Sequence, residues 1–265
     1  MNNLLNNEIH VYGIQRTGQH AIISWLIGHF DEAGFKNCMT SAGERRSQTG
    51  IEPPYWYFNK GNLDWEESNE FRNIDNFIFG TEFSMGRFAL NPNLNDQKLN
   101  IASSFSKDVF SKNRYNLMVI RNPYNHYASI ISWRFNSRLR PPGKFTSYWK
   151  EYAKLFLGEP GGLPGNRIGV VFDKWFEDKQ YRMKISELLN IPFSDSRLNV
   201  VMKIGYKNSW GSSFDKMNLK QEAQKMDVLN RKNQIPADKE RYYKEILKDK
   251  ELKQIWKEVN AKSIY

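Results

Sequence analysis

Ile9-His10-Val11-Tyr12-Gly13 is a short run of β-branched and aromatic residues that ends in a glycine. Such a run predicts a buried strand, and its glycine permits a sharp turn. Beyond the turn, apolar residues recur at helical spacing over residues 19–30: Ile22, Ile23, Leu26, Ile27 and Phe30. We therefore expect a strand, a tight loop and a helix that packs on a sheet, in that order.

Strands and helices are predicted to alternate along much of the remaining chain. Continuous apolar runs predict further strands, covered on both faces, at residues 35–39, 76–80, 116–120 and 168–172. Helical patterns occupy residues 124–136, 145–156 and 181–189, and amphipathic helices follow residue 220. This alternation predicts an α/β fold with a central parallel sheet flanked by helices, and with the C-terminal helices on the outside of the sheet.

Length and composition favour one globular domain, residues 1–265. The chain has 265 residues, of which 40% are hydrophobic, 26% charged and 14% aromatic, and these values exclude a disordered or fibrous protein. The turn-rich stretch at residues 158–165 is interpreted as a connector, because a predicted strand begins three residues after it.

Charge and targeting signals indicate a cytoplasmic protein with anionic ligands. Lys and Arg outnumber Asp and Glu by 39 to 29, and the net charge of +10 favours an anionic partner. The sequence contains no secretory signal and no apolar run long enough to span a membrane. The single cysteine, Cys38, excludes an internal disulfide and a multi-thiolate zinc site, and we expect it to be a buried apolar residue.

The loop between the first strand and the first helix is predicted to bind an anion. Gly13 and Gly18 are five residues apart, as in a nucleotide P-loop, but Gln19 and His20 stand where that loop has Lys and Ser or Thr. Backbone N–H groups at a helix N-terminus attract an anion, and Arg16 adds a positive charge. ATP with magnesium is therefore disfavoured, whereas another anion is not.

A second strand-to-helix junction supports the same interpretation. The block consists of Arg121-Asn122-Pro123-Tyr124-Asn125-His126-Tyr127-Ala128-Ser129. Arg121 ends a predicted strand, Asn122 is a typical N-cap, and Pro123 suits the first position of a helix. Open α/β sheets bind ligands at such junctions, and Ser129 would lie two turns along the helix.

These two blocks resemble those of the sulfotransferases that use 3′-phosphoadenosine 5′-phosphosulfate (PAPS). That family has a Lys/Arg-Ser/Thr-Gly loop near its N-terminus and an Arg-Asn-Pro block with a downstream serine in mid-chain. Two further segments are similar, and all four come in the order of the family: Val170-Val171-Phe172-Asp173-Lys174-Trp175-Phe176 and Ser212-Ser213-Phe214-Asp215-Lys216-Met217. The resemblance implies a sulfotransferase fold, which is related to that of P-loop nucleotide-binding proteins.

The resemblance implies a site for PAPS and for its product, adenosine 3′,5′-bisphosphate. The residues implied around the 5′-phosphosulfate are Arg16, Thr17, Gly18, Gln19 and His20. Those implied at the 3′-phosphate are Arg121 and Ser129, and a partial match to a late basic element adds Arg231 and Lys232. The residues implied at the adenine are Phe172, Ser212, Phe214 and Met217, although Ala21 stands where a tryptophan often stacks on the base.

Sulfuryl transfer needs a cation at the bridging oxygen and a base for the acceptor. Arg16 is the predicted cation, with His20 as a helper, because charge stabilisation dominates this kind of group transfer. Glu82 follows Thr81 at the end of a predicted strand, where small-molecule sulfotransferases have a histidine base. The resemblance therefore implies Glu82 as the base, with His20 and Glu44 as alternatives.

The expected acceptor carries a hydroxyl or amine group on a glycan, a glycolipid or a small molecule. Aromatic residues gather at positions 53–58 and within 138–167, and such side chains suit sugars, phenols and lipid headgroups. A nucleotide kinase is the alternative function, although the mid-chain strand ends in Arg121 rather than a magnesium-binding acid. A nucleic-acid-binding protein is a weaker alternative, because acids are interleaved with the C-terminal Lys and Arg residues.

The histidines are not expected to bind a metal. We expect His10 on a strand face, His29 at a helix end and His126 on a helix surface, and none has partners at metal-ligand spacing.

Overall fold

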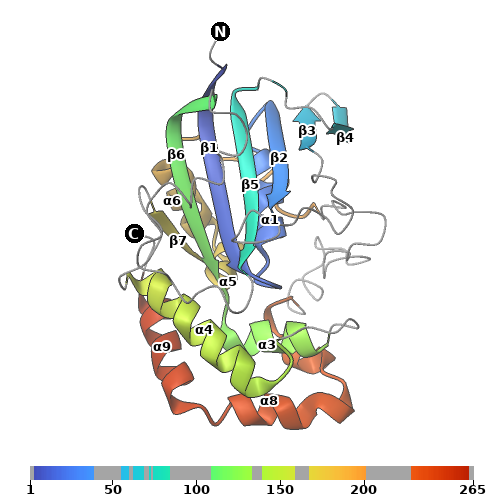
Figure 1. The fold of residues 1–265 in the computed structure, drawn as a ribbon, viewed down its shortest axis with the longest axis vertical. Helices are drawn as coiled ribbons and strands as arrows, with labels where there is room; N and C mark the ends of the chain where they lie inside the picture. Colours follow the sequence, from blue (N-terminus) through green and yellow to red (C-terminus); the bar gives the residue numbers. More distant parts are fainter. Residues whose placement is uncertain are drawn as a thin grey trace.

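The residues that the computed structural model describes form a seven-stranded sheet (Figure 1). They are residues 3–38, 55–59, 62–68, 72, 74–83, 109–132, 139–158, 167–200 and 228–262. The strand order across the sheet is β4-β3-β2-β5-β1-β6-β7. In chain order the strands are β1 (Asn3–Ile14), β2 (Glu32–Cys38), β3 (Tyr55–Asn59), β4 (Asn62–Ser68), β5 (Asn76–Phe83), β6 (Val109–Ile120) and β7 (Arg167–Val171).

The strands predicted from the sequence are the parallel ones, so the α/β fold with a central parallel sheet is confirmed. β2, β5, β1, β6 and β7 pair in parallel in that order. The β3–β4 hairpin, which pairs antiparallel beyond β2, corrects the expectation of an entirely parallel sheet. Its aromatic run buries Tyr57 and Phe58 in the core, as expected where aromatic side chains meet a pleated surface.

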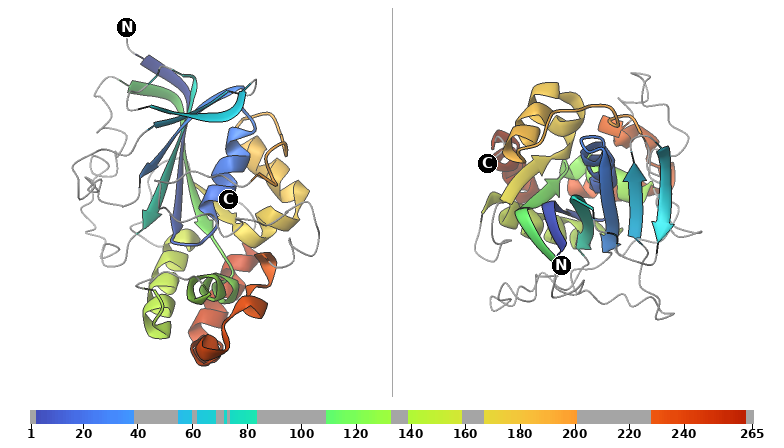
Figure 2. Two further views of the ribbon diagram at one scale, coloured as in Figure 1. Left: turned by 90° about the vertical axis from the view of Figure 1, so that its right-hand side faces the viewer. Right: turned by 90° about the horizontal axis from the view of Figure 1, so that it is seen from above.

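The helices occupy one face of the sheet and the space beyond the carboxyl ends of the strands (Figure 2). On the face lie α1 (Gln19–Ile27), α5 (Phe172–Glu177) and α6 (Lys179–Leu188). Beyond the strand ends lie α3 (Pro123–Ile131), α4 (Pro142–Leu157), α8 (Glu240–Ile246) and α9 (Lys250–Ala261). Two 3-10 helices precede α8, η2 (Arg231–Gln234) and η3 (Ala237–Lys239). The amphipathic C-terminal helices therefore pack on α4 rather than on the outside of the sheet.

Local sequence sets where several helices begin and end. The side-chain oxygen of Asn122 accepts hydrogen bonds from the backbone N–H groups of Tyr124 and Asn125, so the predicted N-cap of α3 is confirmed. α1 ends at Ile27, earlier than predicted. Phe172 begins α5 instead of ending a strand. The predicted extension of α3 to residue 136 lies mostly outside the described residues.

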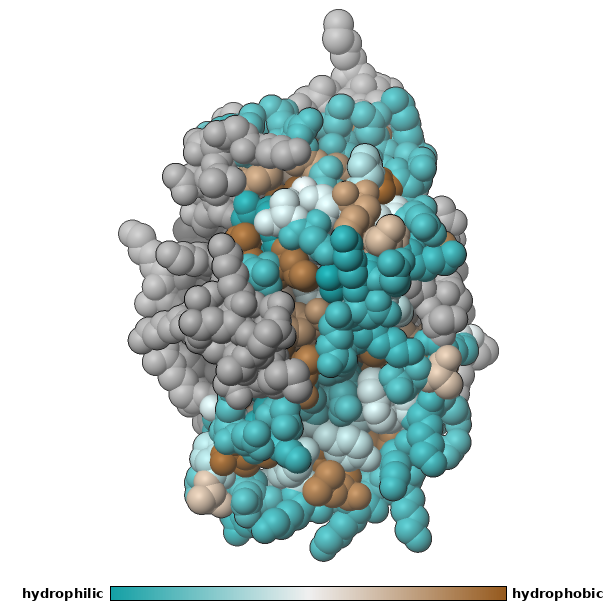
Figure 3. Space-filling view, turned by 180° about the vertical axis from the view of Figure 1, so that it is seen from behind, coloured by the Kyte–Doolittle hydropathy of each residue, from teal (hydrophilic) through white to brown (hydrophobic). Residues whose placement is uncertain are grey.

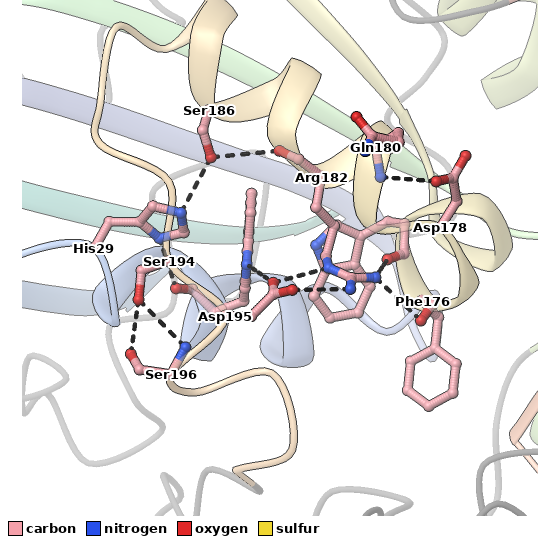
Figure 4. Close-up of polar contacts among 11 residues, drawn as sticks. His29, Phe176, Asp178, Gln180, Arg182, Ser186, Ser194, Asp195 and Ser196 are labelled. Carbon is pink, nitrogen blue, oxygen red and sulfur yellow. Dashed lines mark hydrogen bonds and ion pairs between the residues drawn. The ribbon is translucent and has the colours of Figure 1, made fainter.

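A partly buried polar network fastens α1 to α6 and to the segment after it (Figure 4). Arg182 donates to both carboxylate oxygens of Asp195 at 2.8 and 2.9 Å, and Trp25 Nε1 donates to Asp195 Oδ1 at 3.0 Å. At the end of α1, as predicted, His29 donates from Nδ1 to the Trp25 carbonyl at 2.9 Å, while its Nε2 lies 3.1 Å from Ser186 Oγ. Burial lowers the pKa of His29, which favours the neutral ring.

A second buried polar group lies on the other face of β1. His10 is on a strand face, as predicted, and its Nε2 is 2.6 Å from Glu8 Oε1. Ser111 Oγ and Arg114 Nε donate to the other oxygen of Glu8 at 2.7 and 3.0 Å. Burial opposes ionisation of Glu8, but these hydrogen bonds and the neighbouring positive charges lower its pKa to about 2. The carboxylate is therefore ionised and fully used within the fold.

The described residues on the face drawn in Figure 3 are mainly hydrophilic. Figure 3 shows separate hydrophobic residues among polar ones on the side facing away from Figure 1. Large apolar side chains exposed among the described residues include Leu188, Val200 and Leu247. Within the described ranges, none of the helices combines the length and the hydropathy needed to cross a bilayer.

Candidate functional site

Strand-to-helix junctions of neighbouring parallel strands meet at the carboxyl edge of the sheet. β1 leads through the Gly13–Gly18 loop into α1, β6 leads through Arg121 and Asn122 into α3, and β7 leads directly into α5 at Phe172. Because β6 pairs with β1 on one side and with β7 on the other, these junctions lie side by side. The sheet thus brings together motifs that are about 50 to 100 residues apart, at the edge where open α/β sheets bind ligands.

The glycines of the first loop are required by its shape. Gly18 has a φ of 95° and Arg16 a φ of 72°, both in the left-handed region. A Cβ at position 18 would overlap the ring of Phe172, and one at position 13 would lie 2.5 Å from Thr17 Oγ1. Gly18 is the N-cap of α1, and among the described residues no side chain caps that helix. The backbone N–H groups of the first turn of α1 are therefore not capped by the side chain of the N-cap residue.

Arg121 is buried at the centre of the junctions. Its side chain is 1% exposed, and its guanidinium carbon lies 4.8 Å from the centre of the Phe172 ring. Nη1 donates to the Arg16 carbonyl at 3.3 Å, and Nη2 donates to the Val228 carbonyl at 2.6 Å. Trp149 Nε1 in turn donates to the Arg121 carbonyl at 3.1 Å. The arginine predicted at the end of β6 is thus held between the first loop and the segment before η2.

Like charges surround Arg121. Burial, and then the charges of Arg231 and Arg16, lower the pKa of its guanidinium to about 9, while Asp173 acts in the opposite direction. Asp173 is itself engaged: its oxygens accept from the Asn122 backbone N–H at 2.7 Å and from Asn125 Nδ2 at 3.1 Å. Of these three arginines, Arg121 and Arg231 are buried and Arg16 is partly buried. An anion bound among guanidinium groups that repel one another would stabilise them.

Several buried polar atoms of the predicted site residues have no hydrogen-bond partner in the described part of the chain. They are Thr17 Oγ1, both side-chain polar atoms of Gln19, Arg121 Nε and Ser129 Oγ. A buried polar group without a partner costs about 1–3 kcal/mol. Most of these atoms are hydrogen-bond donors, so oxygens of a phosphate or sulfate group would complete them. The residues present therefore fit a ligand that carries phosphate or sulfate groups.

His126 is a correction to the sequence prediction. Expected on a helix surface, it is fully buried, and its Nε2 donates to the Gln15 carbonyl at 2.7 Å. Burial, together with the charges of Arg121 and Arg16, lowers its pKa to about 3, so the ring is neutral. His126 thus ties α3 to the first loop. Its position in the same block as Arg121, five residues later, could have indicated that it lies near the site. The sequence does not reveal, however, which side of α3 the first loop covers.

The remaining predicted site residues differ in burial and in their distance from Arg121 along the fold. Arg231 is buried next to Arg121, whereas Lys232 is exposed. His20 is partly buried in the first turn of α1. Phe172 is fully buried beneath Gly18 and Arg121, so it supports the loop from behind. Glu82 lies in β5 with its backbone paired to Gly13, beside the first loop.

Several predictions fall outside what the structure describes. Ser212, Phe214, Met217 and Glu44 lie outside the described residues, and for Cys38 the description covers only its backbone at the end of β2. Among the described residues, no group of His, Cys, Asp and Glu side chains is arranged to hold a metal ion.

No protein-family model matches the sequence, and no curated protein matches it. The structure is similar to the sulfotransferase domain of the Synechococcus PCC 7002 olefin synthase, with a TM-score of 0.46 and 12% identity over 92% of this chain and 96% of that one. It is also similar to the sulfotransferase domain of the curacin biosynthetic pathway, with a TM-score of 0.42 and 13% identity over 91% of this chain and 98% of that one. At these identities the likeness concerns the fold alone.

Proposed function

We propose that this chain is a single-domain sulfotransferase that transfers a sulfuryl group from PAPS to a hydroxyl or amine acceptor and releases adenosine 3′,5′-bisphosphate. The observation that carries the proposal is the burial of Arg121 beside Arg16 and Arg231, where the sheet juxtaposes the two motif-bearing junctions. The resemblance of those motifs to the PAPS-dependent family supports PAPS as the anion.

The donor would be held at two anionic ends. Arg16, Thr17, Gln19 and His20 would contact the 5′-phosphosulfate at the N-terminus of α1. Arg121 and Ser129 would contact the 3′-phosphate, with Arg231 beside them and Lys232 as a more exposed contribution. Ser212, Phe214 and Met217 are proposed at the adenine, and Phe172 is proposed to support the loop rather than to face the base.

The residues of the chain would assist transfer in two ways. PAPS would supply an activated sulfuryl group: its bond to the bridging phosphate oxygen would break as a bond to the acceptor oxygen or nitrogen forms, and adenosine 3′,5′-bisphosphate would leave. Arg16 would stabilise the negative charge that develops on the bridging oxygen. Glu82, whose backbone pairs with Gly13, would accept the proton from the acceptor, with His20 and Glu44 as the alternative bases.

The acceptor class and the compartment are part of the proposal. A glycan or glycolipid hydroxyl is favoured over a small phenol or alcohol because of the aromatic residues noted in the sequence. A cytoplasmic location agrees with the lone cysteine. The burial of Arg121 and Arg231 favours a small polyanion over nucleic acid, which would need exposed basic side chains.

A thermal-shift comparison tests the choice of donor. Adenosine 3′,5′-bisphosphate at about 100 times its Kd should stabilise the protein by about 2.7 kcal/mol, and ATP with magnesium should not. Arg121→Ala should abolish the effect, whereas Arg241→Ala, at an exposed position on α8, should retain it. Stabilisation by ATP with magnesium alone would contradict the proposal and favour a kinase.

A further inference from the structure

Asn125 joins α3 to the segment that carries Arg231. Its side chain is 6% exposed in the first turn of α3. Nδ2 donates to the Val228 carbonyl at 2.9 Å and to Asp173 Oδ1 at 3.1 Å, and Oδ1 accepts from the Arg231 backbone N–H at 2.9 Å. These partners lie 103, 48 and 106 residues away in the sequence, so the contacts are wholly tertiary.

These partners require an amide at position 125. Two of them are acceptors, the Val228 carbonyl and the Asp173 carboxylate, and the third is a backbone donor. An amide offers two N–H donors and one carbonyl acceptor, so its orientation is determined by its neighbours. A carboxylate of the same shape has no donor, and it would repel both Asp173 and the Val228 carbonyl.

The same segment also contacts Arg121. The Val228 carbonyl accepts from Arg121 Nη2 as well as from Asn125 Nδ2, and the Val228 side chain is fully buried. Asn125 therefore holds residues 228–231 at both ends, beside the guanidinium that belongs to the anion site. Arg231 follows this attachment directly and lies close enough for its charge to lower the pKa of Arg121.

We propose that Asn125 is a positioning residue that holds residues 228–231 against α3, so that Arg231 joins Arg121 and Arg16 in the anion site. Placing Arg231 near Arg121 is opposed by their repulsion, and a neutral amide can hold the segment without cancelling any of the positive charge. This inference rests on the proposed function for the identity of the anion. The attachment itself does not depend on it.

The test uses isosteric variants of the full chain. Asn125→Asp removes both donors, and Asn233→Asp places the same charge at an exposed position of η2 as the matched control. The dissociation constant of adenosine 3′,5′-bisphosphate is measured by calorimetry, and hydrogen exchange of residues 228–231 is followed without ligand. Asn125→Asp should weaken binding at least about tenfold and speed exchange in the segment, while Asn233→Asp stays within about twofold of the parent.

A double-mutant cycle with Arg231→Ala distinguishes positioning from a general loss of folded structure. If Asn125 acts through Arg231, then Asn125→Asp should weaken binding by no more than about twofold further once Arg231 is removed. Parent-like affinity in Asn125→Asp, or a full additional loss in the double variant, would overturn the inference. Unchanged exchange in residues 228–231 would overturn it as well. Failure of the parent protein to bind the bisphosphate would instead overturn the proposed function, and the exchange result would still test the attachment.

Discussion

Replacing Arg121 by methionine should separate the stability of the protein from its anion binding. Burial lowers the pKa of Arg121 well below its ordinary value, to about 9, which at about 1.4 kcal/mol per unit of pKa means that the buried charge destabilises the unliganded fold by roughly 5 kcal/mol. Below pH 9 the side chain is protonated in both folded and unfolded states, so this full effect is present at pH 7.

The substitution also removes favourable contacts. Arg121 donates to the carbonyls of Arg16 and Val228, and such hydrogen bonds from a charged group contribute about 2 kcal/mol each. The Val228 carbonyl keeps the donor of Asn125. Gain and loss are therefore similar, and Arg121→Met should change the free energy of unfolding by no more than about 2 kcal/mol.

The assay is urea denaturation of parent and variant at pH 7, with and without adenosine 3′,5′-bisphosphate. The parent should gain about 2.7 kcal/mol at 100 times its Kd, whereas Arg121→Met should gain nothing. Arg241→Met at an exposed site is the control and should respond like the parent. A loss well above about 2 kcal/mol without ligand would refute the claim that burial and repulsion of the charge offset its contacts. A retained response to ligand would refute the place of Arg121 in the site.

Further predictions concern the first loop and the buried titratable groups. Gly18→Ala should destabilise the fold by about 2–4 kcal/mol in urea denaturation, because the φ of Gly18 is positive and an added Cβ would overlap the Phe172 ring. Gly143→Ala is the control: no described atom lies within 4 Å of the Cβ that it would add, so it should be neutral or stabilising. Since burial lowers the pKa of His29, the stability that its neutral ring contributes should be fully present above pH 6.5 and should fall as the pH drops below that value. In His29→Gln, the free energy of unfolding should therefore depend less on pH between pH 5 and 8. Since the pKa of Glu8 is lowered to about 2, its ionised form should contribute about 3 kcal/mol to the free energy of unfolding above pH 4.5, and this contribution should be lost between pH 4.5 and pH 2. In Glu8→Gln, unfolding free energies measured over this pH range should lack that loss. The same pH dependence in parent and variant would contradict the assignment.

The proposed anion site combines a left-handed loop residue with a buried arginine near other arginines, and both features destabilise the unliganded fold. Left-handed backbone at Arg16 and the buried charge of Arg121 are maintained because surrounding packing holds them. Natural proteins concentrate such unfavourable features at functional sites. This energetic pattern distinguishes the carboxyl edge of β1 and β6 from the network of Arg182 and Asp195, where opposite charges are paired.

The elements whose signals are local could be predicted from the amino-acid sequence alone. The run at residues 9–13, the glycines of the first loop and the Asn122-Pro123 start of α3 each depend on backbone conformations that neighbouring residues dictate. The central parallel strands could also be predicted, because strands that are buried on both faces form continuous apolar runs in the sequence. Arg16 and Arg121 were therefore located correctly at strand-to-helix junctions before any tertiary information.

Which of these residues share an environment follows from the three-dimensional packing, and the sequence pattern did not reveal it. The hairpin of β3 and β4, the burial of His126, and the attachment of Arg231 through Asn125 all join segments that are distant in the sequence. In a helical sequence pattern, a histidine on the surface cannot be told from a buried one. An asparagine that caps a helix likewise cannot be told from one that is exposed to solvent or that bridges two distant segments. The physical reason is that burial and hydrogen-bond partners are set by strand order and by packing between distant segments, which local periodicity does not record.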